Sequence, residues 1–101
     1  MSSWAERLDW ELEAIMYVDY ALERRQVVRY SVVLTALHEG RRHTVRVYDG
    51  AHGVNEFHRH TLPGGKQPGE PFHAGTLGEG MRAAISEVRH GYREMIEGWR
   101  S

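Results

Sequence analysis

The sequence predicts an α+β fold in which an antiparallel meander of about three strands lies between an N-terminal and a C-terminal helix, both packed on the sheet. Three observations predict it: apolar residues at helical spacing near both ends, β-branched and aromatic residues in the middle, and turns rich in glycine between them. With 101 residues, 41% hydrophobic and 27% charged, the chain has the length and composition of one domain, 1–101.

The N-terminal helix is expected over residues 1–25. Ser3 can serve as its N-cap, and Glu6, three residues later, completes a capping box. Residues 15–24 also fit a strand, because Ile, Tyr and Val favour β structure. The helix is preferred because the segment Ala21–Arg25 contains no turn residue that would end such a strand.

An exposed contact surface is predicted on this N-terminal segment. At about 100° per residue its apolar side chains form two arcs on opposite sides of the helix. Trp10 and Tyr17 lie on the second arc. Because so small a fold rarely covers both sides of a helix, we expect these two residues to contact a second subunit, giving a homodimer, or another protein.

The sheet is predicted over residues 26–60. Runs of Val, Tyr, Leu and Thr alternate there with turn residues, a pattern typical of antiparallel hairpins. The expected strands are Gln26–His38, Thr44–Tyr48 and Asn55–His60, with turns at Glu39–Gly40 and Asp49–Gly53.

The remaining residues are predicted to form a loop and a helix. Residues 61–80 hold all three prolines and six of the eleven glycines, which predicts a long irregular loop. Thr76 and Glu79 have the spacing of a capping box for the C-terminal helix, predicted over 80–100. Its apolar residues fall on one arc, which we expect to face the sheet.

Composition excludes several classes of function. The absence of cysteine excludes disulfides, thiol catalysis and cysteine-ligated metal. No apolar run of about 18 residues is present, and the charged first twenty residues cannot be the core of a signal peptide, so we expect no membrane partner and a cytoplasmic location. The net charge of −1 hides an uneven distribution, because residues 25–66 carry seven bases, three acids and five of the seven histidines. An anionic partner such as RNA would meet this segment.

The residues suited to chemistry lie between Arg46 and His60, and Lys66 offers a further cation after them. Histidines two apart in a strand point to one side, where they can act as acid and base on one phosphodiester. A carboxylate can orient an imidazole, and cations can hold phosphoryl oxygens. These roles give Asp49, His52, His58 and His60 as candidate catalytic residues and Arg46, Arg59 and Lys66 as candidate substrate-binding residues.

Three other interpretations of the same residues stay open. His52, His58 and His60 offer three imidazole ligands, the number that a zinc or other divalent metal site needs, whereas the acid–base reaction needs no cofactor. A surface that binds a partner needs only the positive charge. The histidines can also be rim residues that bond to loop carbonyls.

The turn Tyr48-Asp49-Gly50-Ala51-His52-Gly53, followed by His58-Arg59, resembles an uncharacterised family of small, mainly actinobacterial proteins. That family is remotely similar to the TumE-like toxins of bacterial toxin–antitoxin pairs. The resemblance covers about residues 26–100. The family's arginine lies two residues before the aspartate, where this chain has Val47; Arg46 is one place earlier and should leave the opposite face of the strand.

The resemblance implies a toxin that acts on RNA by metal-independent acid–base cleavage and is neutralised by a protein antitoxin. His52 and His58 would be acid and base, with Asp49 orienting one of them. The alternative, from a different class, is a homodimeric adaptor without enzymatic activity, with or without a histidine-ligated metal.

Overall fold

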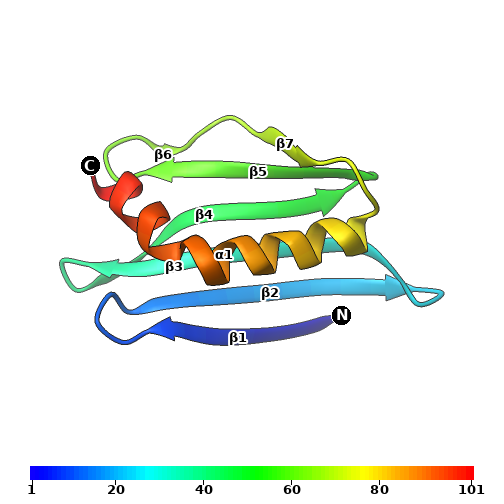
Figure 1. Cartoon of the computed structure of the whole chain (residues 1–101), viewed down its shortest axis with the longest axis horizontal. Coiled ribbons are helices and arrows are strands. Elements are labelled where there is room, and N and C mark those ends of the chain that lie inside the picture. The colour runs from blue at the N-terminus through cyan, green and yellow to red at the C-terminus, as the bar shows by residue number, and fades with distance from the viewer.

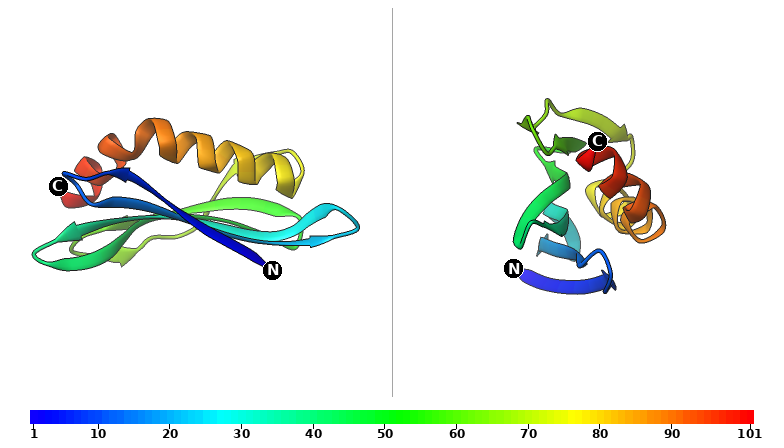
Figure 2. Two further views of the ribbon diagram at one scale, coloured as in Figure 1. Left: turned by 90° about the horizontal axis from the view of Figure 1, so that it is seen from below. Right: turned by 90° about the vertical axis from the view of Figure 1, so that its left-hand side faces the viewer.

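One antiparallel sheet of seven strands carries a single helix, α1, across one of its faces (Figure 1). The computed structural model describes all residues, 1–101. The sheet and the helix form two layers, and the face of the sheet opposite α1, here called the open face, has no element over it (Figure 2). The elements are β1 (Ser2–Asp9), β2 (Ala14–Glu23), β3 (Gln26–His38), β4 (Arg41–Ala51), β5 (Val54–Thr61), β6 (Gly65–Lys66), β7 (Glu70–His73) and α1 (Leu77–Arg100).

The first five strands form a simple meander in the order β1-β2-β3-β4-β5. Short β6 and β7 both pair with β5, so the segment after β5 folds back along the edge of the sheet. The hairpin turns use left-handed backbone conformations, with φ of 51° at Arg24, 65° at Arg25, 54° at His52 and 78° at Gly53. Consecutive left-handed residues match the twist of two-residue hairpins, so the turn at Arg24–Arg25 forms without glycine.

The predicted architecture is wrong in its N-terminal part, because residues 1–25 form the β1–β2 hairpin and no helix. Along β2 the residues Ala14, Met16 and Val18 are buried, and the residues between them lie on the open face. This two-residue period decides the structure, because α1 can cover only one side of the hairpin. The strand alternative for residues 15–24 is the one that forms.

The middle and C-terminal expectations also need correction. The sheet has seven strands where about three are predicted, and residues 61–80 contain β6 and β7. Helix α1 begins at Leu77, three residues before the predicted start. Its capping box is confirmed: the Thr76 hydroxyl accepts from the Glu79 amide at 3.1 Å, and the Glu79 carboxylate accepts from the Thr76 amide at 2.8 Å.

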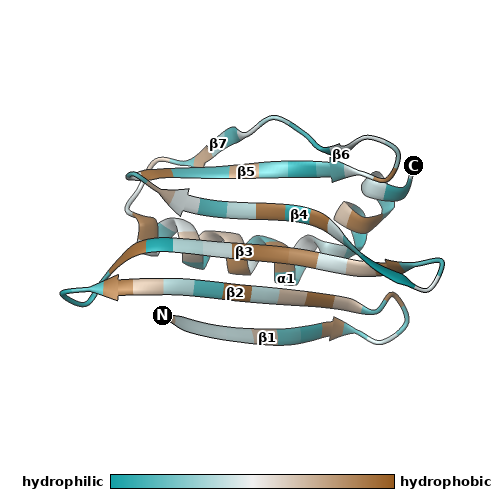
Figure 3. Ribbon diagram, turned by 180° about the vertical axis from the view of Figure 1, so that it is seen from behind, coloured by the Kyte–Doolittle hydropathy of each residue, from teal (hydrophilic) through white to brown (hydrophobic).

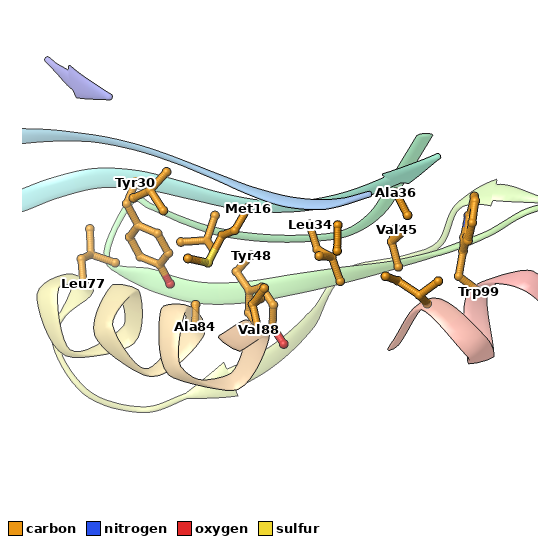
Figure 4. Close-up of a cluster of buried hydrophobic side chains, with 14 residues drawn as sticks. Met16, Tyr30, Leu34, Ala36, Val45, Tyr48, Leu77, Ala84, Val88 and Trp99 are labelled. Atoms are coloured by element: carbon orange, nitrogen blue, oxygen red, sulfur yellow. The ribbon is translucent and has the colours of Figure 1, made fainter. Parts of the chain in front are cut away.

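The core lies between α1 and the near face of strands β2 to β4 (Figure 4). Alternating hydropathy along these strands places the apolar side chains in that layer (Figure 3). No stretch of α1 is apolar enough to cross a membrane. The buried apolar residues are Ala14, Met16, Val18, Tyr30, Val32, Leu34, Ala36, Val45, Tyr48, Leu77, Ala84, Val88, Ile96 and Trp99.

A buried amide connects the start of α1 to the sheet. Asn55, at the beginning of β5, is 2% exposed. Its Oδ1 accepts a hydrogen bond from the Tyr30 hydroxyl at 2.8 Å, and its Nδ2 lies 3.1–3.3 Å from the carbonyl oxygens of His73, Gly75 and Thr76. A Cβ on Gly80 would overlap this amide, so glycine lets the first turn of α1 approach. Asn55 therefore sets where α1 meets the sheet.

Replacing Asn55 with alanine is expected to lower the free energy of unfolding by about 3 kcal/mol, because the Tyr30 hydroxyl and the loop carbonyls lose their buried partner. Urea denaturation followed by circular dichroism measures the change. Val54→Ala, at an exposed neighbouring position, is the control and should cost under about 0.5 kcal/mol. Equal losses in the two variants would contradict this role of Asn55.

Candidate functional site

The β4–β5 hairpin carries most of the candidate residues and divides them between the two faces of the sheet. Paired residues on antiparallel strands point to the same face, and faces alternate along each strand. Tyr48 pairs with Phe57 on the face covered by α1, and Arg46 pairs with Arg59 two residues further along that face. Asp49 pairs with Glu56 on the open face.

Arg46 and Arg59 stand directly opposite each other beside a small cavity. Like charges at directly opposed positions destabilise a sheet. The cavity, here called the arginine pocket, measures about 210 Å³ and lies between the ends of β4 and β5 and the last turns of α1. Its lining is Val45, Arg46, Arg59, His60, Thr61, Glu94, Met95, Gly98 and Trp99.

The two arginines are only weakly neutralised by the protein. Arg59 has an ion pair with Glu70 at 3.7 Å, and both of these side chains are more than half exposed. Arg46 has no carboxylate within 4.0 Å, and its nearest oxygen partner is the Tyr48 hydroxyl at 3.4 Å. Glu94, the carboxylate of the lining, has no ion pair with either arginine. Arg46 therefore has no carboxylate partner of its own and can bind an anion.

Two stacked aromatic rings, those of Phe57 and Tyr48, lie next to the arginines. Both guanidinium groups lie over the Phe57 ring, at 5.5 Å and 5.6 Å from its centroid. Phe57 stacks on Tyr48 with ring centroids 5.8 Å apart. Burial raises the pKa of Tyr48 to about 12, and its hydroxyl donates to Glu87 on α1 at 2.8 Å. Both arginines therefore lie within cation–π distance of the same ring on this face.

His60 also lines the arginine pocket and lies two residues along β5 from His58. Its Nε2 is buried and has no hydrogen-bond partner in the protein. Burial lowers the pKa of His60 below the ordinary 6.5, and the charges of Lys66 and His58 lower it further. Lys66 lies opposite His60 in the β5–β6 ladder. A neutral imidazole with an unpartnered nitrogen can act as a proton acceptor at neutral pH.

A second cluster lies on the open face and consists of Asp49, Glu56 and His58. The Nε2 atom of His58 is 3.7 Å from Oδ2 of Asp49, and Nδ1 of His58 is 3.1 Å from the carbonyl oxygen of Gln67. Burial raises the pKa of Asp49; the charge of His58 lowers it, and that of Glu56 raises it. Among the candidate catalytic residues, Asp49 and His58 are the carboxylate and the histidine that lie in contact.

His52 lies apart from the other candidate histidines. It occupies the exposed tip of the β4–β5 hairpin, next to the pair Ala51–Val54, whereas His58 pairs with Val47 four positions along the ladder. At about 3.4 Å per residue this separation is roughly 14 Å. The structure therefore does not bring His52 together with His58 or His60, either for acid–base chemistry or around one metal ion.

The two expected interface residues are exposed on the N-terminal hairpin. Trp10, 77% exposed, lies in the β1–β2 turn with the Arg7 guanidinium 4.1 Å from its ring centroid. Tyr17 is 38% exposed and lies on the open face opposite Ala5. These two residues therefore lie on a strand face and in a turn, and do not share one side of a helix. Their contact with a partner stays a prediction.

Three residues of these sites were missed by sequence reasoning. Glu56 lies opposite Asp49 through strand register, Gln67 contributes a backbone oxygen, and Asn55 is buried next to the hairpin turn. For Glu56 a signal was present: with the turn centred at residues 52–53, hairpin pairing matches position 49 with position 56. The other two depend on the path of the segment after β5.

Comparison with known proteins yields no relative: no protein-family model, no curated protein and no solved structure matches the chain.

Replacing Arg59 with glutamine is expected to stabilise the protein by about 0.5 kcal/mol in phosphate-free buffer, since it removes the repulsion from Arg46. Inorganic phosphate at 20 mM should raise the melting temperature of the wild type more than that of Arg59→Gln. Thermal unfolding with and without phosphate measures both effects, and sodium chloride at equal ionic strength controls for screening. A phosphate effect of the same size in both proteins would contradict an anion site here.

Proposed function

We propose that the protein binds a phosphodiester of RNA in the arginine pocket and cleaves it by acid–base chemistry, as the toxin of a toxin–antitoxin pair. The observation that carries the proposal is the opposed pair Arg46 and Arg59 beside a cavity that His60 also lines. An anion between the two guanidinium groups would relieve their repulsion and accept charge-assisted hydrogen bonds from both. The resemblance of the Tyr48–Gly53 turn to the family related to TumE-like toxins supports the same assignment.

Each step of RNA cleavage has a group in the pocket or beside it, because Lys66 lies opposite His60 in the β5–β6 ladder. Neutral His60 accepts the proton of the ribose 2′-hydroxyl, whose oxygen attacks phosphorus and forms a 2′,3′-cyclic phosphate. The bond to the 5′-oxygen breaks, and the Lys66 ammonium donates the proton that this leaving oxygen needs. Arg46 and Arg59 stabilise the charge that develops on the phosphoryl oxygens. The 2′-hydroxyl is the nucleophile, so DNA is not a substrate.

In the proposed reaction His60 is the general base, and His52 takes no part. Purified His60→Gln and the double variant Arg46→Gln/Arg59→Gln are expected to cleave single-stranded RNA at least about 100-fold more slowly than the wild type. Induced wild type should arrest growth, and both variants should be tolerated at equal soluble abundance. His52→Asn is the matched control, because asparagine tolerates the left-handed turn that His52 occupies, and it should behave as the wild type.

Two results would overturn the proposal. One is purified wild type that neither cleaves RNA nor arrests growth. The other is RNA cleavage that His60→Gln leaves intact while His52→Asn abolishes it. That result would make His52, at the tip of the β4–β5 hairpin, the residue that cleavage requires. Product analysis adds a check, because the reaction must leave a 2′,3′-cyclic phosphate on one fragment and a 5′-hydroxyl on the other.

The pH profile of cleavage tests the state of His60. The base acts in its neutral form, and the pKa of His60 is lowered, so the acid limb of kcat/KM should lie below pH 6.5. Lys66→Gln removes a charge that lowers this pKa and should move the limb to higher pH while also slowing the reaction. Circular dichroism at each pH separates this effect from unfolding. A limb above pH 6.5 in the wild type would argue against His60 as the base.

A further inference from the structure

We propose that Asp49, Glu56 and His58 form a binding site for one divalent transition-metal ion on the open face. This site is separate from the arginine pocket, which faces α1 across the same two strands. Ligand atoms of the three residues, one from each, all lie within 4.8 Å of one another, and each residue is half-buried. The sequence predicts a different set, in which two ligands besides His58 are histidines.

Strand register brings two like charges together at this site. Asp49 and Glu56 are directly opposed in the β4–β5 ladder, and His58 lies two residues along β5 on the same face. Opposed carboxylates repel each other unless a cation lies between them. Ligands at about 2.1 Å from one metal ion are about 3.0–3.4 Å apart, so small side-chain rotations bring these atoms to coordination distance.

The hydrogen bond from His58 to Gln67 points independently to a ligand. The Gln67 carbonyl oxygen can only accept, so Nδ1 of His58, 3.1 Å away, must carry a hydrogen. In the neutral ring this leaves the lone pair on Nε2, which faces the Asp49 carboxylate at 3.7 Å. Metal-binding histidines are oriented in this way, with one nitrogen donating to a backbone carbonyl and the other free for the metal.

The protein supplies little cationic charge of its own to these carboxylates. Neither Asp49 nor Glu56 accepts a hydrogen bond from another residue, and their one ion-pair contact within 4.0 Å is that of Asp49 with His58 itself. The charge of Lys66 lowers the pKa of Asp49, but Lys66 forms no ion pair with it within 4.0 Å. Gly69 passes over the cluster, where a Cβ would stand 2.8 Å from the His58 ring and 3.0 Å from Oε2 of Glu56. Glycine here lets the backbone cover one side of the site.

The donor set selects the kind of ion. Two carboxylates with one imidazole suit a borderline ion such as Zn²⁺ or Co²⁺ better than Mg²⁺ or Ca²⁺, which prefer sites made only of oxygen. Three protein ligands leave further positions to water on the side that Gly69 does not cover, because no helix or strand lies over the open face. The geometry therefore favours an exchangeable ion over a fully enclosed structural one.

Titration of the untagged, full-length protein with Co²⁺, followed by visible absorption and by calorimetry, tests the site. The wild type should bind one equivalent, and His58→Ala and Glu56→Gln should each weaken binding at least about 10-fold. Glu56→Gln keeps the size of the side chain, so it separates loss of a ligand from loss of folding, which the apo melting temperature monitors. His52→Asn and His60→Gln are matched controls and should bind as the wild type does.

Either of two results would overturn the metal site. The wild type could show no saturable binding up to 1 mM Co²⁺, or binding could survive Glu56→Gln and be lost in His52→Asn or His60→Gln, which would indicate the histidine set. RNA cleavage is measured separately in metal-free buffer with EDTA. Its outcome decides the proposed function and leaves the metal result unaffected, so the two proposals fail independently.

Discussion

The buried amide of Asn55 is the interaction on which the arrangement of this protein depends. It joins β3, β5 and the segment that enters α1, because its Oδ1 accepts from the Tyr30 hydroxyl and its Nδ2 lies within 3.3 Å of three backbone carbonyl oxygens. An unpaired amide at this depth would be costly, so the helix can begin only where those carbonyls face Asn55. From that point α1 crosses β3, β4 and β5 and covers one face of the sheet. The opposite, open face has no helix or strand over it.

The two clusters of like charge lie on opposite faces of the β4–β5 hairpin. Alternation along the two strands sends Arg46 and Arg59 toward α1 and sends Asp49, Glu56 and His58 to the open face. Each site contains an opposed pair of like charges, which a folded sheet normally avoids. Such pairs lower stability unless a counter-ion binds, so an anion on one face and a cation on the other would each stabilise the same hairpin.

Local sequence signals predicted the parts of the fold that local interactions decide. The capping box at Thr76 and Glu79 depends on neighbouring residues and is confirmed, and three strands within residues 26–60 are present. The N-terminal helix is wrong, because the apolar residues of β2 fit both a helical and a two-residue period over this short segment. Turns at Arg24–Arg25 and at Glu13 form without glycine, so the usual signal for a hairpin was absent.

The sequence by itself determined which residues are available: a cysteine-free chain whose basic, histidine-rich middle segment carries Arg46, Asp49, His58, Arg59 and His60. It also determined the opposite-face directions of Arg46 and Asp49, because strand alternation is a local property. Only the tertiary structure decided which of these residues meet. Contacts such as Asp49 with Glu56, or His58 with the Gln67 carbonyl, depend on register and on the return of the chain along β5, and these are fixed by packing of α1 against the sheet.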